Sequence, residues 1–263
     1  MNACVENNSL TMIPKIIHLC WLSGDPYPTK IAKCLESWKT FLPDYEVVLW
    51  DTKRFDLNSS LWVKQACEKK KYAFAADYIR FYALYHMGGV YLDSDVEVIK
   101  PFDDLLDLPY FIGAEKAGTP EAAIIGAEKG CDWIKQCLDY YDNRSFVKTD
   151  GTLDIRKLPE IMDEQIGKLK PLRVLSIEES KNIRAFDFSR EVLVFNDAYF
   201  SPKVFDSREV ELTSYTYAVH HYQNSWFSPK AKAYYRSRAF FVKLFGIGLV
   251  RRAEKLLMPW KFK

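Results

Sequence analysis

The stretch GGVYLDSDVEV, residues Gly88 to Val98, reads as a buried strand that carries two aspartates in its middle. A bare carboxylate is costly to bury and normally pairs with a cation or binds a metal. Residues i and i+2 of an extended strand face the same side. We therefore expect Asp93 and Asp95 to point together, with Ser94 turned away.

Short apolar runs alternate with helical patterns through the first half of the chain. Strands are predicted at Lys15–Trp21, Tyr45–Asp51, Val90–Val98 and Pro109–Glu115, and helices at Lys30–Phe41, over Leu61–Met87 as two helices, and within Ala122–Tyr141. The segments Val192–Pro202 and Ser214–Tyr222 look like later strands. Gly88 and Gly89 are expected to form the turn from helix to strand. The alternation predicts an α/β sheet.

The position of the two acids favours an oxygen-rich ligand site. In open α/β sheets, ligands bind beyond the carboxyl ends of the strands. Hard cations such as Mg²⁺ or Mn²⁺ prefer carboxylate ligands and leave room for phosphate oxygens. A turn or a satisfied surface pair is the alternative, because a D-x-D pattern is common. An EF-hand loop is not expected, since Val98 and Asp104 occupy the positions where that loop needs Gly and Glu.

Composition narrows the classes of partner. The 263 residues are 48% apolar and 15% aromatic, enough for a sizeable core. A net charge of +2 argues against nucleic acid as the main partner. The charge is uneven, because residues 230–263 hold ten Lys or Arg and one acid, a net +9, whereas the remaining 27 basic and 34 acidic residues total −7. An acidic body with a basic tail is therefore expected.

The start of the chain and its cysteines favour a cytosolic protein. MNACVENNSL has neither the basic nor the apolar region of a signal peptide. No apolar run approaches the roughly 20 residues that span a bilayer. The six cysteines show no C-x-x-C pattern and are expected to be free thiols.

Several blocks together resemble one enzyme family. AADYIRFYALYHMGGVYLDSDVEV, residues 75–98, is similar to the core signature of sugar-utilising glycosyltransferases with a D-x-D motif. The resemblance is strongest to glycosyltransferase family 32, with its yeast-type mannosyltransferases and bacterial capsule transferases, and more distant to the clostridial glucosylating toxins. IPKIIHLCW and LPDYEVVLWD resemble the first two strands of the family, and HHYQNSW, residues 220–226, resembles its closing motif. The match runs from residue 13 to about 227.

The resemblance implies a GT-A fold, in which a Rossmann-like sheet holds a nucleotide-sugar donor with Mn²⁺ or Mg²⁺. It implies transfer of a hexose with retention of configuration, from UDP-galactose, UDP-glucose or GDP-mannose, to a glycan or lipid-linked glycan in bacterial surface polysaccharide synthesis. The expected organisation is an N-terminal extension at 1–12, a GT-A catalytic domain at 13–229 and a basic, helical tail at 230–263.

The resemblance also implies roles for individual residues. Asp95 would bind the metal directly, and Asp93 would contact the ribose, the sugar or metal-bound water. Asp77 and Arg80, one turn apart on a helix, would hold the sugar hydroxyls and the phosphate side and complete the catalytic set. A plain ion pair of this spacing is the alternative, worth a few tenths of a kcal/mol.

Further donor contacts are implied at His18, Trp21, Tyr91, Ser94 and Trp226. A packing role is the alternative for the strand residues His18 and Tyr91, because a lone strand histidine is more often a satisfied core residue.

The adjacent histidines His220 and His221 follow an alternating strand, so they should point to opposite sides. At most one of them can be a third protein ligand of the metal. Two buried, hydrogen-bonded histidines are the alternative.

Two other functions stay open at this point. A phosphohydrolase of the haloacid-dehalogenase type also places D-x-D after an apolar strand, although usually near the chain start and followed by Gly-Thr. A non-catalytic nucleotide- or glycan-binding module is the second. The basic tail suits either amphipathic helices at the cytoplasmic face of the inner membrane or a helix packed on the domain.

Overall fold

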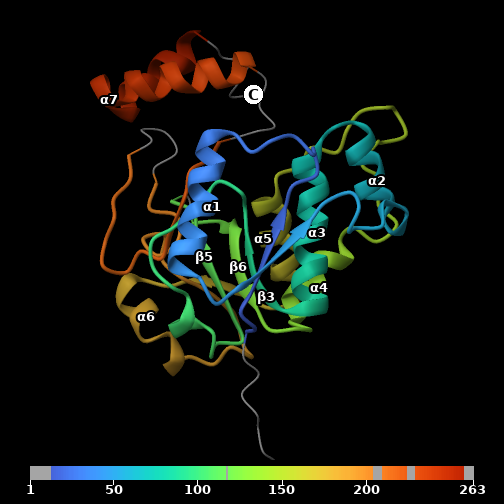
Figure 1. The fold of residues 1–263 in the computed structure, drawn as a ribbon. Coiled ribbons are helices and arrows are strands. Elements are labelled where there is room, and N and C mark those ends of the chain that lie inside the picture. The colour runs from blue at the N-terminus through green and yellow to red at the C-terminus, as the bar shows by residue number, and fades with distance from the viewer. Residues whose placement is uncertain (1–12, 117, 204–208, 224–228, 258–263) are drawn as a thin grey trace, which may run out of the picture.

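The computed structural model describes residues 13–116, 118–203, 209–223 and 229–257. Its centre is a five-stranded sheet of order β2-β1-β3-β6-β5 (Figure 1). The strands are β1 (Ile16–Cys20), β2 (Glu46–Trp50), β3 (Gly89–Leu92), β5 (Tyr110–Ala114) and β6 (Pro120–Ala127). β1, β2 and β3 are parallel, and β6 runs antiparallel to both β3 and β5. The predicted α/β sheet is confirmed.

Helices cover both faces of this sheet. α1 (Thr29–Phe41) lies on one face, and α3 (Tyr72–Met87), α4 (Asp132–Asp139) and α5 (Leu158–Leu169) lie on the other. Successive side chains of β3 point to opposite faces of the sheet. Val90 and Leu92 lie in the same hydrophobic cluster as Trp38 of α1, whereas Tyr91 lies in the hydrophobic cluster that contains residues of α3. α2 (Leu61–Glu68) precedes α3, as the two-helix prediction required.

The remaining elements are short. They are the 3₁₀ turns Leu57–Ser59, Asp103–Leu105 and Ile183–Ala185, the helix α6 (Ile177–Lys181), and two two-stranded sheets, β4 (Val96–Val98) with β9 (Ala218–His220) and β7 (Leu172–Val174) with β8 (Val192–Val194). β8 and β9 fall inside the two later segments predicted as strands.

The strand predicted at Val90–Val98 is wrong as a single element. β3 ends at Leu92, and a turn closed by the hydrogen bond from Val96 N to Asp93 O leads into β4. β4 then leaves the central sheet, because α1 holds it through a bond from Trp38 Nε1 to the Val96 carbonyl, 2.8 Å. Asp93 and Asp95 therefore lie on a turn, and the shared strand face that we expected does not exist.

Gly88 and Gly89 form the turn from α3 into β3, as predicted. Gly89 has φ of +107°, and a Cβ there would lie 2.6 Å from the carbonyl oxygen of Ile16. We expect Gly89→Ala to lower the free energy of unfolding by roughly 1–3 kcal/mol, through both strain and crowding.

Gly130 supplies the matched control for this prediction, because its φ is +82° but nothing lies within 4 Å of its added Cβ. Denaturant unfolding of both alanine variants separates crowding from strain. Equal losses in the two variants would contradict the close approach of β3 to β1.

α7 (Pro229–Leu257) forms the predicted helical extension, and it is bent rather than straight. Gly246, with φ of 76° and ψ of 156°, breaks the helix into two arms. The arms contact each other, since Arg238 Nε of the first lies 2.7 Å from Glu254 Oε1 of the second. α7 is therefore a helical hairpin at one end of the molecule (Figure 1).

Two further expectations concern the thiols and the membrane. The five cysteines in the described part of the chain are free thiols, and Cys4 lies outside the described residues. Among the described helices, none combines the length and the apolarity that a bilayer crossing requires.

Candidate active site

The D-x-D turn lies at the carboxyl edge of the parallel strands, directly after β3. Asp93 still extends the ladder with β6, because its N–H donates to the Ala123 carbonyl at 2.9 Å. Asp95 is buried, while Asp93 and Ser94 are partly exposed. This is the edge at which open α/β sheets bind ligands.

The predicted residues Asp77, Arg80 and Tyr91 form a buried cluster beneath the turn, and this cluster contacts the partly exposed Asp93. Arg80 donates from Nη2 to Asp77 Oδ1 at 2.9 Å and lies 3.4 Å from Asp93 Oδ1. Its guanidinium stacks 4.5 Å from the centre of the Tyr91 ring, and the Tyr91 hydroxyl donates to Asp93 Oδ1 at 2.8 Å. Arg80 Nη1 also donates to the Ala122 carbonyl. The contacts of Arg80 and Tyr91 with Oδ1 therefore fix the orientation of the Asp93 carboxylate.

Burial separates this ion pair from an ordinary helix-surface pair. The side chains of Arg80 and Asp77 are 5% and 12% exposed. Burial raises the pKa of Asp77 to about 7, against the opposing charge of Arg80. The i,i+3 ion pair of the alternative is therefore present, but it is buried and not on the helix surface. Whether Asp77 and Arg80 contact a donor stays a prediction.

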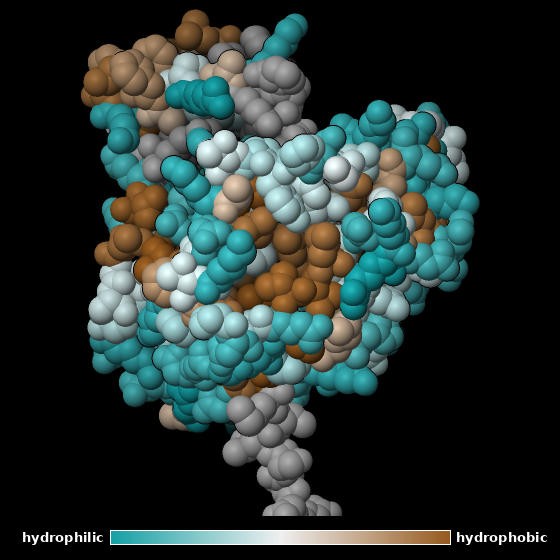
Figure 2. Space-filling view, in the orientation of Figure 1, coloured by the Kyte–Doolittle hydropathy of each residue, from teal (hydrophilic) through white to brown (hydrophobic). Residues whose placement is uncertain are grey.

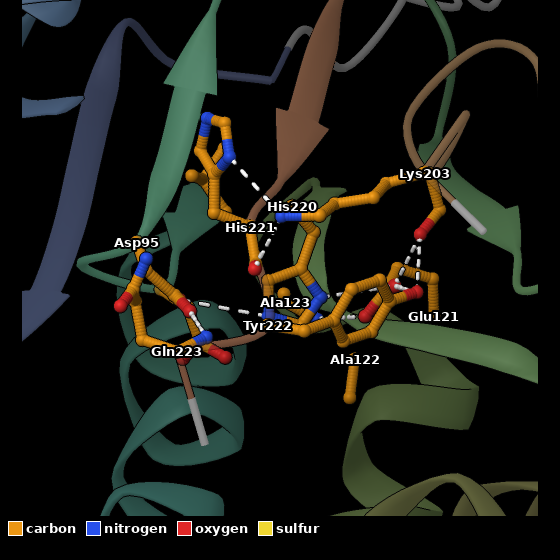
Figure 3. Close-up of polar contacts among 12 residues, drawn as sticks. Asp95, Glu121, Ala122, Ala123, Lys203, His220, His221, Tyr222 and Gln223 are labelled. Carbon is orange, nitrogen blue, oxygen red and sulfur yellow. Dashed lines mark hydrogen bonds and ion pairs between the residues drawn. The ribbon is translucent and has the colours of Figure 1, made fainter. Parts of the chain in front are cut away.

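His220 reaches the turn because β9 pairs with β4. The antiparallel register places His220 opposite Val96, next to Asp95. His220 Nε2 lies 3.5 Å from Asp95 Oδ1, and the N–H of Gln223 donates to Asp95 Oδ2 at 2.7 Å (Figure 3). Burial opposes the charge on Asp95, but His220 and this N–H lower its pKa to about 2. Asp95 is a carboxylate in this setting.

A buried glutamate lies on the other side of the same imidazole. Glu121, at the start of β6, lies 3.2 Å from His220 Nδ1 (Figure 3). Ser201 Oγ and the Tyr222 hydroxyl donate to Glu121 Oε2, at 2.8 and 3.1 Å. Burial again opposes the charge, but His220 and the Ser201 hydroxyl lower the pKa of Glu121 to about 2. Desolvation of His220 is outweighed by Glu121 and Asp95, which raise its pKa well above the usual value.

Asp93, Asp95 and His220 have the composition and spacing of a divalent-cation site. Each offers one ligand atom, and these atoms all lie within 4.8 Å of one another. Two metal–ligand bonds of about 2.1 Å join atoms slightly less than this distance apart, so the side chains would need to move by only a few tenths of an ångström to bind one cation. Two carboxylates and an imidazole suit Mn²⁺, and Mg²⁺ fits the carboxylates. The residues present therefore fit the predicted cation.

The two adjacent histidines point apart, as the alternation required. His221 Nε2 lies 2.7 Å from Glu97 Oε2. Figure 3 shows the Lys203 ammonium, which donates to the His221 carbonyl at 2.8 Å. Of the two histidines, only His220 belongs to the group of candidate metal ligands found among the described residues. The geometry therefore favours His220 over His221 as the third ligand.

His18 and Trp21 lie in different surroundings. His18 is fully buried, with Nε2 2.7 Å from the Gly88 carbonyl and Nδ1 accepting from the Trp50 indole at 3.2 Å. Both ring nitrogens thus have protein partners, which matches the packing alternative. Trp21 follows β1 at the same edge as the D-x-D turn, partly exposed and 4.8 Å from the Tyr27 ring. A donor contact at Trp21 stays a prediction, and Trp226 lies outside the described residues.

Glu121 is the site residue that the sequence reading missed. It lies in PEAAIIGA, the run that forms β6 and for which we predicted no strand. A single acid in an apolar run was the available signal, the same signal that drew attention to Asp93 and Asp95.

Comparison with known proteins places the chain in a family. The family model described as "glycosyltransferase sugar-binding region containing DXD motif" matches residues 28–112. An uncharacterized glycosyltransferase of Acanthamoeba polyphaga mimivirus is 32% identical over 181 residues, which cover 65% of this chain and 72% of that protein. The chain belongs to the family of glycosyltransferases with a DXD-containing sugar-binding region, as its motifs indicated. This membership removes the phosphohydrolase alternative.

Two further similarities are narrower. Inositol phosphoceramide mannosyltransferase 3 of Schizosaccharomyces pombe is 30% identical over 138 residues, 51% of this chain and 38% of that protein. The chain thus spans well under half of the length of this fungal relative. The solved structure of the PaToxG glycosyltransferase has a TM-score of 0.43 at 20% identity, covering 66% of this chain and 73% of that one. A TM-score this low has no bearing on substrate or activity.

Proposed function

We propose that the chain is a metal-dependent, retaining glycosyltransferase that moves a hexose from a nucleotide sugar to a glycan acceptor. Family membership supports the reaction class. The observation that carries the metal dependence is the approach of Asp93, Asp95 and His220 to within 4.8 Å at the carboxyl end of β3. Binding of a nucleotide sugar without turnover, as by a non-catalytic module, is the competing outcome.

In this proposal each residue has a stated task. Asp95 and His220 would hold a divalent cation, which when bound would supply Lewis-acid neutralisation of the charge on the diphosphate leaving group. Asp93 presents its carboxylate toward the donor, and its orientation is set by Tyr91 and Arg80. The acceptor hydroxyl attacks the anomeric carbon on the face from which the phosphate departs, and the leaving phosphate takes the proton of that hydroxyl. We therefore assign no covalent nucleophile.

For the donor, the similarity to the mannosyltransferase of Schizosaccharomyces pombe supports mannose, so GDP-mannose is the first compound to test. UDP-glucose and UDP-galactose are the other two candidates. For the acceptor, we propose a glycan or lipid-linked glycan in bacterial surface polysaccharide synthesis, on the basis of the resemblance to capsule transferases.

A single incubation separates the outcomes. Protein with Mn²⁺ and each of the three nucleotide sugars is expected to release nucleoside diphosphate slowly from one of them. Mass measurement identifies the released sugar. Saturable binding with no release from any donor would contradict transferase activity and favour the binding module.

We propose in addition a peripheral location at the cytoplasmic membrane face through residues 230–263. The support is the surface of α7, which carries Phe241 at 48%, Leu244 at 58% and Phe245 at 56% exposure near the Gly246 bend. Figure 2 shows brown, apolar side chains gathered on this part of the molecule. The cations of the hairpin complement an anionic bilayer, where each gains roughly 1 kcal/mol; they include Arg236, Lys243, Arg251, Arg252 and Lys255.

Co-sedimentation with vesicles tests this location. The full chain is expected to pellet with phosphatidylglycerol vesicles more than with phosphatidylcholine, and less at high salt. The double variant Phe241→Ser with Phe245→Ser should lower the bound fraction several-fold, whereas Ile155→Ser, at a site 62% exposed on the domain, should not. Equal pelleting of both variants, or no preference for anionic lipid, would exclude this role of α7.

A further inference from the structure

We infer that Glu121 is a positioning residue, which fixes the His220 ring so that Nε2 faces the cation site. The inference rests on the proposed function, because it names the residue that prepares one ligand of the same site. It assigns a role to a side chain from β6, whereas both aspartates lie on the turn between β3 and β4.

The first support is the direction of the imidazole. His220 Nδ1 lies 3.2 Å from Glu121 Oε2, and Nε2, on the opposite side of the ring, lies 3.5 Å from Asp95 Oδ1. A carboxylate at Nδ1 holds a proton on that nitrogen and leaves Nε2 to a metal. Metal-binding histidines generally donate their second ring N–H to such a partner, which fixes both the tautomer and the orientation of the ring.

The second support is the way in which Glu121 itself is held. The residue is 1% exposed, and the N–H of Ala123 donates to its Oε1 at 2.9 Å. Its Oε2 accepts from Ser201 and Tyr222. In the described part of the chain, His220 is the one basic side chain within salt-bridge distance of Glu121. A buried carboxylate without Lys or Arg is costly, so this arrangement is best understood as a rigid support for the histidine.

A purely structural role must be separated from this one, because Glu121 also ties Ser201 and Tyr222 to β6. Ser201→Ala provides the matched control, since it removes the 2.8 Å hydrogen bond to Oε2 and leaves the contact with His220 in place. Glu97→Gln provides a second control, because Glu97 lies 2.7 Å from His221 on the opposite side of β9.

The test measures Mn²⁺ affinity directly, by electron paramagnetic resonance of the full chain, with thermal melting in parallel. Glu121→Gln keeps the shape of the side chain and is expected to weaken Mn²⁺ binding 10- to 100-fold, the usual range for loss of such a partner. Glu121→Asp retracts the carboxylate by one methylene and should give the same loss. Glu97→Gln should bind Mn²⁺ like the wild type, and Ser201→Ala, which removes only one of the bonds that hold Glu121, should lose less affinity than Glu121→Gln.

A double-mutant cycle completes the design. If Glu121 acts through the imidazole, Glu121→Gln should add no further loss once His220→Ala is present. Wild-type Mn²⁺ affinity in both Glu121 variants, or an undiminished loss in the His220→Ala background, overturns the positioning role and leaves the proposed function standing. Donor cleavage in EDTA by a wild type that does not bind Mn²⁺ overturns the positioning role and the metal dependence together.

Discussion

Asp95→Asn is expected to lower the rate of donor cleavage by at least about 10²-fold, on the scale of losing a key electrostatic group. The amide keeps the shape of the side chain and can still accept from Gln223, but it lacks the charge that Asp95 presents next to His220. The rate of nucleoside diphosphate release at saturating Mn²⁺ is the quantity to measure. Chelation of the wild type with EDTA should abolish this rate, and added Mn²⁺ should restore it.

Asp107→Asn is the control for this variant. Asp107 pairs with Arg184 on the surface, with both side chains about half exposed, so the rate should be unchanged. A rate for Asp95→Asn within a few-fold of the wild type, or full activity in EDTA, would remove the cation from the mechanism.

Arg80→Met is expected to lower the free energy of unfolding by roughly 3 kcal/mol, because removal of one partner leaves buried charge without compensation. Arg80 pairs with both Asp77 and Asp93, and it also donates a hydrogen bond to the Ala122 carbonyl. Burial already raises the pKa of Asp77 to about 7, so this carboxyl can take up a proton when Arg80 is lost. The cost should therefore lie near the lower end of the 3–5 kcal/mol typical of broken buried pairs.

The chain contains an exposed pair with the same spacing as a control. Lys39 and Glu36 also stand three residues apart on a helix, with side chains 74% and 69% exposed. Lys39→Met should change the free energy of unfolding by less than about 1 kcal/mol. Urea unfolding of both variants gives the comparison, and similar small losses would mean that the buried cluster beneath the D-x-D turn is not formed.

The parallel half of the sheet could be predicted because each of its strands has a local signal. The apolar runs at β1 and β2 are bounded by turn residues, and the pair Gly88-Gly89 marks the end of α3. The break between β3 and β4 could not be predicted, because VYLDSDVEV keeps an apolar pattern on both sides of it. Its cause is tertiary, since β4 bonds to Trp38 of α1 and pairs with β9, more than a hundred residues away.

The candidate site could likewise be predicted from the sequence only in part. Asp93, Asp95 and the alternation of the two histidines were visible in short motifs, and the structure brings three of these four side chains together. The reason that we gave for the meeting of the aspartates was wrong, because a turn and not a strand face joins them. Glu121 was missed because its contact with His220 depends on the tertiary pairing of β6 with β3, which no local sequence pattern indicates.

A crystal structure with Mn²⁺ and a nucleoside diphosphate, with data collected at the manganese absorption edge, tests the central claim most directly. We expect an anomalous peak between Asp95 and His220, close to Asp93, with diphosphate oxygens completing the shell of ligands. A nucleoside diphosphate bound elsewhere, or bound at this edge of the sheet with no manganese between Asp95 and His220, would contradict it.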